Sequence, residues 1–359
     1  MAYRRIPSKM RTIIVKKLAS NFREATEIVE VEIPKPGPKE ILVKNRYVGV
    51  NASDINYTAG RYDPKKKPPF PTGFEGLGEV VGTGPEASLK VGQIVLYSKF
   101  GAFSDYIAVE ESAAIPVPSV DPAYLSLMVS GLTASVALEK EADLKAGKTV
   151  LVTAAAGGTG QFAVQIAKLA GCQVIGTCSS DDKTDFLKSI GCDRAVNYRK
   201  ESLGEVLSKE YPKGVDVVYE SVGNEMFDTA LKNLAIYGRL IVIGMISTYE
   251  GQEVKEGNTF QDLQEKRTVN IPMTLLTKSA SVRGFFLPHY RPDYARHIAN
   301  LAKLYKEGKL KVSSDSGVGA PNGPFVGLDK VADAVEYMYL RKNVGKVIVE
   351  LGKDDKSAL

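Results

Sequence analysis

The sequence predicts an α/β protein in which a doubly wound parallel sheet is joined to a second, all-β and barrel-like module. A glycine turn at 157–160 separates an apolar, β-branched run from a helical pattern, and further apolar runs alternate with helical patterns as far as residue 287. Such alternation is typical of a parallel sheet. In the first third of the chain, by contrast, Pro and Gly punctuate short apolar runs, which indicates the all-β module.

The glycine turn predicts a binding site for a pyrophosphate. Residues 149–153 favour a buried strand, and 161–170 has the apolar spacing of a helix. Between them, Gly157, Gly158 and Gly160 lack Cβ atoms where a pyrophosphate would approach the backbone and the helix N-terminus. Because the spacing is Gly-Gly-x-Gly and not Gly-x-Gly-x-x-Gly, a purely structural loop is the alternative.

The next unit of sequence favours NADPH over NADH. A second strand is predicted at 173–178, and the residue that follows such a strand lies near the adenosine ribose of a dinucleotide. Here Ser179 follows the strand and Lys183 lies one helical turn further on, and a hydroxyl with an ammonium suits a 2′-phosphate. Asp181 and Asp182 argue for NADH, since a carboxylate binds a 2′-hydroxyl, but Asp at a helix start commonly caps the helix.

Four further predicted strands end in small or polar residues. They lie at 196–198, 215–223, 238–244 and 281–287. In open α/β sheets the carboxyl ends of the strands line the ligand crevice. Packing is the alternative for any one of these residues, whereas the set together favours cofactor binding. The predicted contacts are Tyr198, Ser221, Gly223, Ile243, Phe285, Phe286 and Leu287.

Composition and charge argue against several other classes of protein. The net charge of +5 is spread along the chain and suits an anionic small molecule, without the footprint of a nucleic-acid-binding protein. No apolar stretch reaches the about 20 residues of a transmembrane helix, so no membrane insertion is expected. The three cysteines lack Cys-x-x-Cys spacing and are expected in the core. The lysine run 65–67 lies in a Pro-rich loop, where a solvated loop is favoured over an anion-attracting site.

The carboxyl-terminal part is expected to return to the first module. A helix is predicted at 325–338, and a strand at 345–351 is expected to rejoin the β module after an irregular connection at 308–324. The predicted division is 1–130 for the β module, 131–288 for the nucleotide-binding domain and 289–359 for the returning segment.

Several motifs along the chain are shared with one enzyme superfamily. They are Val-Asn-Ala-Ser-Asp-Ile-Asn at 50–56, Gly-Arg-Tyr at 60–62, Gly-Phe-Glu-Gly at 73–76, Tyr-Glu-Ser-Val-Gly at 219–223 and Gly-Phe-Phe-Leu at 284–287, besides the glycine turn. Over nearly its whole length the chain resembles the quinone-oxidoreductase branch of the medium-chain dehydrogenase/reductases. The resemblance implies a GroES-like catalytic domain beside a Rossmann-type NADP-binding domain. It also implies NADPH-dependent reduction of the carbon–carbon double bond of α,β-unsaturated ketones, most closely as in the reductases of 15-oxo-prostaglandins.

The same resemblance implies roles for further residues. Thr159 would bind the pyrophosphate together with the adjoining glycines, and Tyr198 would lie at the 2′-phosphate. The backbone at 285–287 would meet the nicotinamide amide. Asn343 would reach the cofactor from the returning segment, an expectation that depends on the resemblance alone.

Zinc-dependent members of the superfamily hold their metal with Cys and His ligands, and these positions can be located here. They carry Asn51 in place of the Cys, Phe74 in place of the His and Val129 near the third ligand position. A zinc site needs about three nitrogen, sulfur or oxygen ligands from the protein. The cysteine-rich lobe that holds a structural zinc is also missing from the sequence. We therefore expect no bound metal.

Tyr62 is the candidate proton donor. Without a metal, enone reduction requires hydrogen-bond donors for the enolate oxygen and a proton for the α-carbon. Tyr62 occupies the position at which related enoyl thioester reductases carry their proposed tyrosine donor, and a reference pKa of about 10 keeps a tyrosine protonated at neutral pH. Asn51 would orient substrate or nicotinamide through its amide. A loop tyrosine without a catalytic role is the alternative, in which case solvent or the nicotinamide ribose hydroxyl supplies the proton.

Three functions remain open: an ene reductase, a quinone reductase on the same site, and a non-catalytic NADPH-binding protein. An enoyl thioester is another conceivable substrate. The resemblance implies a homodimer formed by pairing sheet edges of the nucleotide-binding domains. The chain ends in Ser-Ala-Leu, which resembles the Ser-Lys-Leu peroxisomal signal without its basic residue. The peroxisome is therefore expected by resemblance and the cytoplasm by default.

Overall fold

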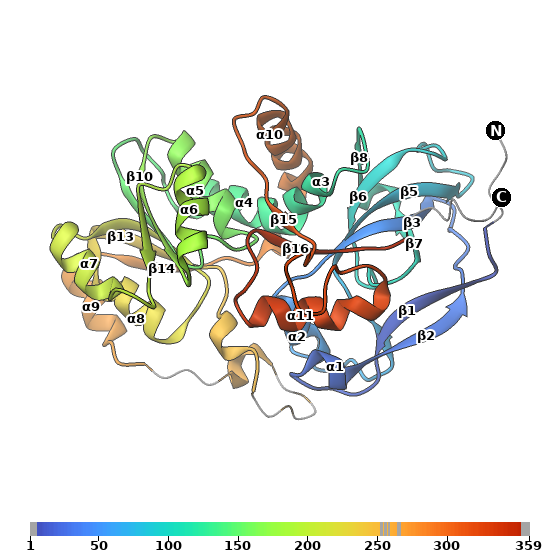
Figure 1. The fold of residues 1–359 in the computed structure, drawn as a ribbon, viewed down its shortest axis with the longest axis horizontal. Coiled ribbons are helices and arrows are strands. Elements are labelled where there is room, and N and C mark those ends of the chain that lie inside the picture. The colour runs from blue at the N-terminus through green and yellow to red at the C-terminus, as the bar shows by residue number, and fades with distance from the viewer. Residues whose placement is uncertain (1–5, 252–253, 255–256, 258, 264–266, 353–359) are drawn as a thin grey trace.

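The structure is a computed structural model that describes residues 6–251, 254, 257, 259–263 and 267–352. Two lobes lie side by side, one built on a parallel sheet and the other rich in antiparallel strands (Figure 1). Strand β16 (Lys346–Glu350) and helix α11 (Val331–Tyr339), both from the end of the chain, lie near the middle of the molecule. Within the described residues, no helix is long and apolar enough to cross a membrane.

Six parallel strands form one sheet, in the spatial order β11-β10-β9-β12-β13-β14. They are β9 (Thr149–Val152), β10 (Gln173–Cys178), β11 (Arg194–Asn197), β12 (Val215–Glu220), β13 (Leu234–Val242) and β14 (Ser281–Gly284). Val150 and Val152 pack into one core together with Phe162, whereas Leu151 packs into another with Leu207. Successive residues of a strand thus face cores on opposite sides, and the doubly wound sheet that the sequence predicts is confirmed.

The helices of this lobe connect successive strands or cover the sheet. They are α4 (Leu132–Glu141), α5 (Gly160–Leu169), α6 (Asp181–Ser189), α7 (Leu203–Glu210), α8 (Asn224–Lys232), α9 (Ile271–Lys278) and α10 (Tyr294–Lys306). From β9 the chain builds outward to β10 on one side, and it later returns to place β12 on the other. The carboxyl ends of β9 and β12 therefore flank the point at which the strand order reverses, where open α/β sheets bind their ligands.

The β module has a core of its own. Its strands are β1 (Lys9–Val15), β2 (Thr26–Glu32), β3 (Glu40–Gly49), β4 (Phe70–Pro71), β5 (Glu75–Thr83), β6 (Ile94–Ser98), β7 (Tyr106–Glu110) and β8 (Ala114–Val117), with helices α1 (Phe22–Ala25), α2 (Ser53–Thr58) and α3 (Pro122–Ser126). The long strand β3 pairs antiparallel with β5, β7 and β16. Ile41, Val43, Val80 and Tyr97 are fully buried and pack together inside this curled sheet.

The end of the chain returns to the β module. After the short strand β15 (Ser314–Asp315) and helix α11, strand β16 pairs antiparallel with β3, with Ile348 opposite Gly49. The sequence predicts this return. The domain boundaries after residues 130 and 288 stay predictions.

Several predicted elements differ in their limits from those in the structure: the strands predicted at 196–198, 215–223 and 238–244 lie at Arg194–Asn197, Val215–Glu220 and Leu234–Val242. Two further differences have a clear physical reason. The helix expected at 325–338 begins only with a 3-10 turn at Leu328–Lys330, because Gly327 has a φ of +92°, which interrupts a right-handed helix. The strand expected at 281–287 ends at Gly284, since a 3-10 segment with a proline in its first turn follows at Leu287–Asp293. The three cysteines are buried and unpaired, as the sequence predicts.

Candidate active site

The glycine turn between β9 and α5 presents three backbone amides. Among the described residues, the N–H groups of Gly158, Thr159 and Gly160 donate to no protein atom. The Thr159 hydroxyl lies 2.6 Å from the Tyr219 hydroxyl and donates to the Ser130 carbonyl oxygen at 3.1 Å, so it does not cap the helix. Unpaired amides at the positive end of a helix are suited to an anion, and the turn therefore fits a pyrophosphate.

Ser179, Lys183 and Tyr198 all contact one residue that the sequence interpretation missed, Arg341. The Lys183 Nζ donates to the Arg341 carbonyl oxygen at 2.7 Å, and the Ser179 hydroxyl donates to the same oxygen at 3.4 Å. The Arg341 guanidinium in turn donates to the Tyr198 hydroxyl at 3.4 Å. Burial lowers the pKa of Lys183, and the positive charges of Arg199 and Arg341 lower it further. A group of cations that repel one another fits a 2′-phosphate.

The returning segment lies directly against the glycine turn. The amide of Gly345 donates to the Ala156 carbonyl oxygen at 2.8 Å, and Gly157 forms a β-bridge with Gly345. Asn343 is buried, and its Nδ2 donates to the Gly345 carbonyl oxygen at 2.8 Å. Asn343 thus lies beside the turn, while its contact with a cofactor stays a prediction.

Glu220 organises the end of β12. Its carboxylate accepts hydrogen bonds from the amides of Val222 at 2.9 Å and Gly223 at 3.1 Å, and from the Thr153 hydroxyl at 3.3 Å. Burial nevertheless raises the pKa of Glu220 to about 7. The Ser221 hydroxyl donates to the Thr153 carbonyl oxygen at 3.3 Å, so the ends of β9 and β12 are joined where the strand order reverses.

The predicted nicotinamide segment follows β14. Phe285 is buried, and its ring stacks on Tyr290 with ring centres 4.9 Å apart. Ile243 and Leu287 are partly buried and pack against the same core. Phe286 is 39% exposed, so it is the most accessible to a ligand of the three predicted contacts after β14.

Tyr62 lies among aromatic rings from both lobes. Its ring centre is 5.7 Å from that of Phe74 in the β module. The Tyr62 ring also stacks on the ring of Phe286, with the two ring centres 6.0 Å apart. Phe260, the first residue of a 3-10 turn at Phe260–Asp262, approaches to 5.1 Å. The structure thus brings the candidate proton donor beside the segment that is predicted to meet the nicotinamide.

Burial raises the pKa of Tyr62 above its ordinary value, and the neighbouring Ser53 offsets this only in part. The phenol therefore keeps its proton across the neutral range and can donate it.

Asn51, Glu75 and Lys346 form a buried group that the sequence interpretation did not foresee. The Lys346 Nζ donates to Asn51 Oδ1 at 2.5 Å and lies 2.6 Å from Glu75 Oε1. Asn51 Nδ2 donates to the same Glu75 oxygen at 2.9 Å and to the Gly49 carbonyl oxygen at 3.4 Å. Both ends of the Asn51 amide are therefore engaged within the protein.

These residues do not fit a catalytic zinc ion. Phe74 and Val129 offer no side-chain ligand atom, and the Val129 amide donates to Glu75 Oε2 at 2.8 Å. The Lys346 ammonium already neutralises Glu75 and takes up the Asn51 oxygen. About three free protein ligands are needed for zinc, and this position does not provide them.

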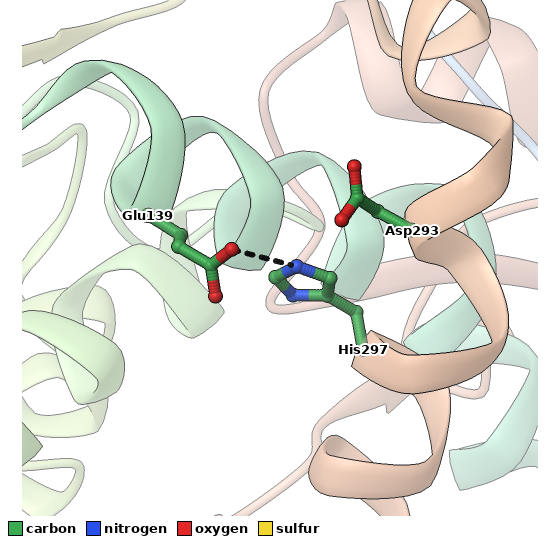
Figure 2. Close-up of side chains that lie close together, drawn as sticks. All are labelled: Glu139, Asp293 and His297. Atoms are coloured by element: carbon green, nitrogen blue, oxygen red, sulfur yellow. Dashed lines mark ion pairs between the residues drawn. The ribbon is translucent and has the colours of Figure 1, made fainter.

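A second group of conceivable metal ligands lies between α4 and α10. Figure 2 shows Glu139, Asp293 and His297, whose ligand atoms lie within 4.8 Å of one another. Arg296 donates to Glu139 at 2.6 Å and to Asp293 at 2.9 Å, and Lys140 pairs with Asp293 at 3.2 Å. Burial lowers the pKa of His297. Because two cations neutralise the carboxylates, the group is explained as an ion-pair network that joins the two helices.

Comparison with known proteins agrees with this architecture. Residues 37–119 match the alcohol dehydrogenase GroES-like domain, and residues 158–303 match the zinc-binding dehydrogenase family. Prostaglandin reductase-3 of Bos taurus is 53% identical over 99% of this chain and 93% of its own length. A probable quinone oxidoreductase of Leishmania amazonensis is 44% identical over 96% of this chain and 99% of its own length. The crystal structure of Escherichia coli quinone oxidoreductase complexed with NADPH superimposes with a TM-score of 0.80, at 26% identity, covering 95% of this chain and 99% of that chain.

The fold, the two domain matches and the solved structure define an oxidoreductase of the medium-chain dehydrogenase/reductase superfamily, in its quinone-oxidoreductase branch. Within that branch, the chain belongs to the prostaglandin reductase-3 family. The resemblance inferred from the sequence motifs is thereby confirmed.

Proposed function

We propose that this protein is an NADPH-dependent ene reductase that reduces the carbon–carbon double bond of α,β-unsaturated ketones, with 15-oxo-prostaglandins as the substrate class. The observation that carries the proposal is the ring of Tyr62 stacked against Phe286, with its hydroxyl kept neutral by burial. A proton donor is thus held beside the predicted nicotinamide segment. The high identity to prostaglandin reductase-3 supports the choice of substrate class.

NADPH would be held along the carboxyl ends of the strands. The amides of Gly158, Thr159 and Gly160 would bind the pyrophosphate, and Ser179, Lys183, Tyr198 and Arg341 would bind the 2′-phosphate. Ser221, Gly223, Ile243, Phe285, Phe286, Leu287 and Asn343 complete the proposed cofactor set. When bound, NADPH supplies the hydride that adds to the β-carbon of the enone.

The residues of the β module would then complete the reaction. Hydride addition to the β-carbon leaves an enolate, whose α-carbon takes a proton to give the saturated ketone. We assign this proton to Tyr62, and the phenolate is then reprotonated from solvent. The rings of Phe74, Phe260 and Phe286 exclude water around Tyr62 and favour an apolar substrate.

Asn51 remains in the proposal as a positioning residue. Its amide is bonded to Lys346 and Glu75, so we assign it the task of holding the loop before α2 against the returning strand. The proposed site is zinc-independent, because Asn51, Phe74 and Val129 do not form a zinc site.

A homodimer is a further part of the proposal. Strand β14 is one of the two outer strands of the parallel sheet, and an edge strand can pair with a second copy. Light scattering of the purified protein should give twice the mass of the chain. The peroxisomal assignment also stays a proposal, since the Ser-Ala-Leu terminus lies outside the described residues.

Product analysis tests the proposed function. The protein is incubated with NADPH and a 15-oxo-prostaglandin, and in parallel with a quinone. A product heavier by two hydrogens with the ketone retained supports the ene reductase. Unchanged prostaglandin with a reduced quinone would instead support the quinone reductase, and NADPH binding without either product would support a non-catalytic role.

A further inference from the structure

Four rings beside Tyr62 form a continuous aromatic platform. We use this name for Tyr57, Phe70, Phe74 and Phe100. The Tyr57 ring stacks on Phe100 at 4.5 Å and contacts the edges of Phe70 at 5.3 Å and Phe74 at 5.5 Å. Tyr57 is buried, whereas Phe100 is 46% exposed, so the platform runs from the interior to the surface of the β module.

Lys66 lies on this platform, in contrast to the solvated loop that the sequence favours. Its Nζ is 4.7 Å from the centre of the Phe70 ring and 5.1 Å from the centre of the Tyr57 ring. It also donates to the Tyr57 hydroxyl at 2.7 Å. The neighbouring Lys65 and Lys67 are exposed, as expected for a solvated loop.

The ammonium of Lys66 has donors to spare. Among the described residues, no carboxylate lies within ion-pair distance of its Nζ, and the Tyr57 hydroxyl takes one of its three N–H groups. The faces of aromatic rings attract a cation, but they carry no negative charge that could neutralise the ammonium ion. A partly buried ammonium with free N–H groups and no counter-charge among the described residues is suited to bind an anion from outside the chain.

The platform connects Lys66 to the proposed site. The Tyr57 ring centre lies 6.3 Å from that of Tyr62, so the Lys66 Nζ is at most about 11 Å from the Tyr62 ring centre. In a 15-oxo-prostaglandin, the carboxylate lies about nine bonds from the β-carbon of the enone. With carbon–carbon bonds of about 1.5 Å, a path of that length reaches at most about 11 Å, and the ring bond within it shortens this limit.

We propose that Lys66 anchors the terminal carboxylate of the substrate, with the accessible rings of the aromatic platform, Phe74 and Phe100, beside the part of the substrate between this carboxylate and the enone. The inference rests on the proposed ene-reductase function and names the substrate feature that the site selects. Enones with an anionic chain end are favoured over neutral enones of the same length. Lys66 is thus a specificity-determining residue and takes no part in the transfer of hydride or proton.

Substrate pairs that differ only in charge test the inference. A 15-oxo-prostaglandin and its methyl ester are compared in wild type, Lys66→Gln and Lys66→Arg, with Lys65→Gln as the matched control. We expect Lys66→Gln to raise KM for the acid by about ten- to hundred-fold. Turnover of the ester should stay unchanged, and Lys66→Arg should keep most of the preference for the acid. Equal KM values of the wild type for acid and ester would overturn the inference. So would an equal rise in KM for both substrates in Lys66→Gln.

Binding measurements separate this inference from the proposed function. Calorimetry with the NADP+-loaded protein gives the Kd of acid and ester without any turnover. If wild type reduces no enone but binds the acid more tightly than the ester, and Lys66→Gln abolishes the difference, the ene-reductase proposal fails while the anchor stands. Equal Kd values for acid and ester refute the anchor whether or not the enzyme turns over. Thermal unfolding of each variant verifies that the comparison is made between folded proteins.

Discussion

The Nζ of Lys346 lies 2.6 Å from Glu75 Oε1, and both side chains are almost completely buried. Lys346 belongs to the returning strand β16, whereas Glu75 begins β5 in the β module. The pair stands next to Asn51, where zinc-dependent relatives would hold a metal ligand. An ammonium ion from the end of the chain thus supplies positive charge at this position, and it fastens the returning segment to the β module.

Removal of Lys346 should destabilise the protein strongly. Lys346→Met leaves the Glu75 carboxylate buried without its counter-charge, and breaking a buried pair in this way costs about 3–5 kcal/mol. Urea unfolding measures the loss, with the exposed neighbour Lys342→Met as control. The double variant Lys346→Met/Glu75→Gln should recover part of the stability, because it leaves no unpaired charge. A loss below about 1 kcal/mol in the single variant would show that the pair contributes no more than a surface ion pair.

A zinc chelator should leave the activity unchanged. Asn51, Phe74 and Val129 do not provide a ligand set, and Lys346 already occupies the Glu75 carboxylate. Elemental analysis before and after chelation, together with the rate of NADPH oxidation, checks this expectation. Stoichiometric zinc whose removal abolishes turnover would contradict it.

The preference for NADPH should depend on Lys183. The ammonium is held by the Arg341 carbonyl oxygen and faces further cations, so Lys183→Ala removes a donor that only the 2′-phosphate requires. We expect the ratio of kcat/KM for NADPH over NADH to fall by about ten- to hundred-fold, as for the loss of one charge-assisted hydrogen bond. Lys200→Ala is the control, because Lys200 is exposed and pairs with Asp181. An equal effect on both cofactors would place Lys183 outside the 2′-phosphate site.

Because the folded protein holds a proton on Asp54, its free energy of unfolding should fall as the pH rises. Burial raises the pKa of this carboxyl to about 8, from the 3.8 of an unperturbed aspartic acid. Between these two values the folded chain holds a proton that the unfolded chain has released, so raising the pH across this range favours unfolding. Asp54→Asn carries no such proton and should flatten the pH dependence.

Thermal unfolding from pH 5 to pH 8.5 for wild type and Asp54→Asn measures this difference. The gap between the two proteins should widen toward high pH in favour of the variant. A constant gap across the range would mean that Asp54 titrates alike in the folded and unfolded chains.

The sequence predicts those parts of the site that depend on local patterns. The glycine turn and the strand ends that carry Ser179 and Ser221 could be located because apolar periodicity and glycine spacing are short-range signals. Arg341 and Lys346 were missed because their partners lie in other elements. The hydrogen bond between Lys346 and Asn51 joins residues 295 positions apart in the chain, and no spacing rule covers such a distance.

Side-chain surroundings were also beyond the reach of the sequence. The run of three lysines at 65–67 has the composition of a solvated loop, yet the middle residue lies on aromatic rings that come from separate segments. Phe260 likewise reaches Tyr62 from a three-residue 3-10 turn, a segment too short for a periodic pattern. Such contacts join residues that are distant in the sequence, and no local pattern specifies them.

Hydride transfer to the β-carbon is the central claim, and isotope labelling tests it most directly. The protein is incubated with a 15-oxo-prostaglandin and NADPH that carries deuterium at the transferred C4 position, and the product is examined by NMR. We predict deuterium at the former β-carbon, an unlabelled α-carbon and an intact ketone. Deuterium on a newly formed carbinol carbon, or a substrate that stays unlabelled while NADPH is bound, would contradict the assignment as an ene reductase.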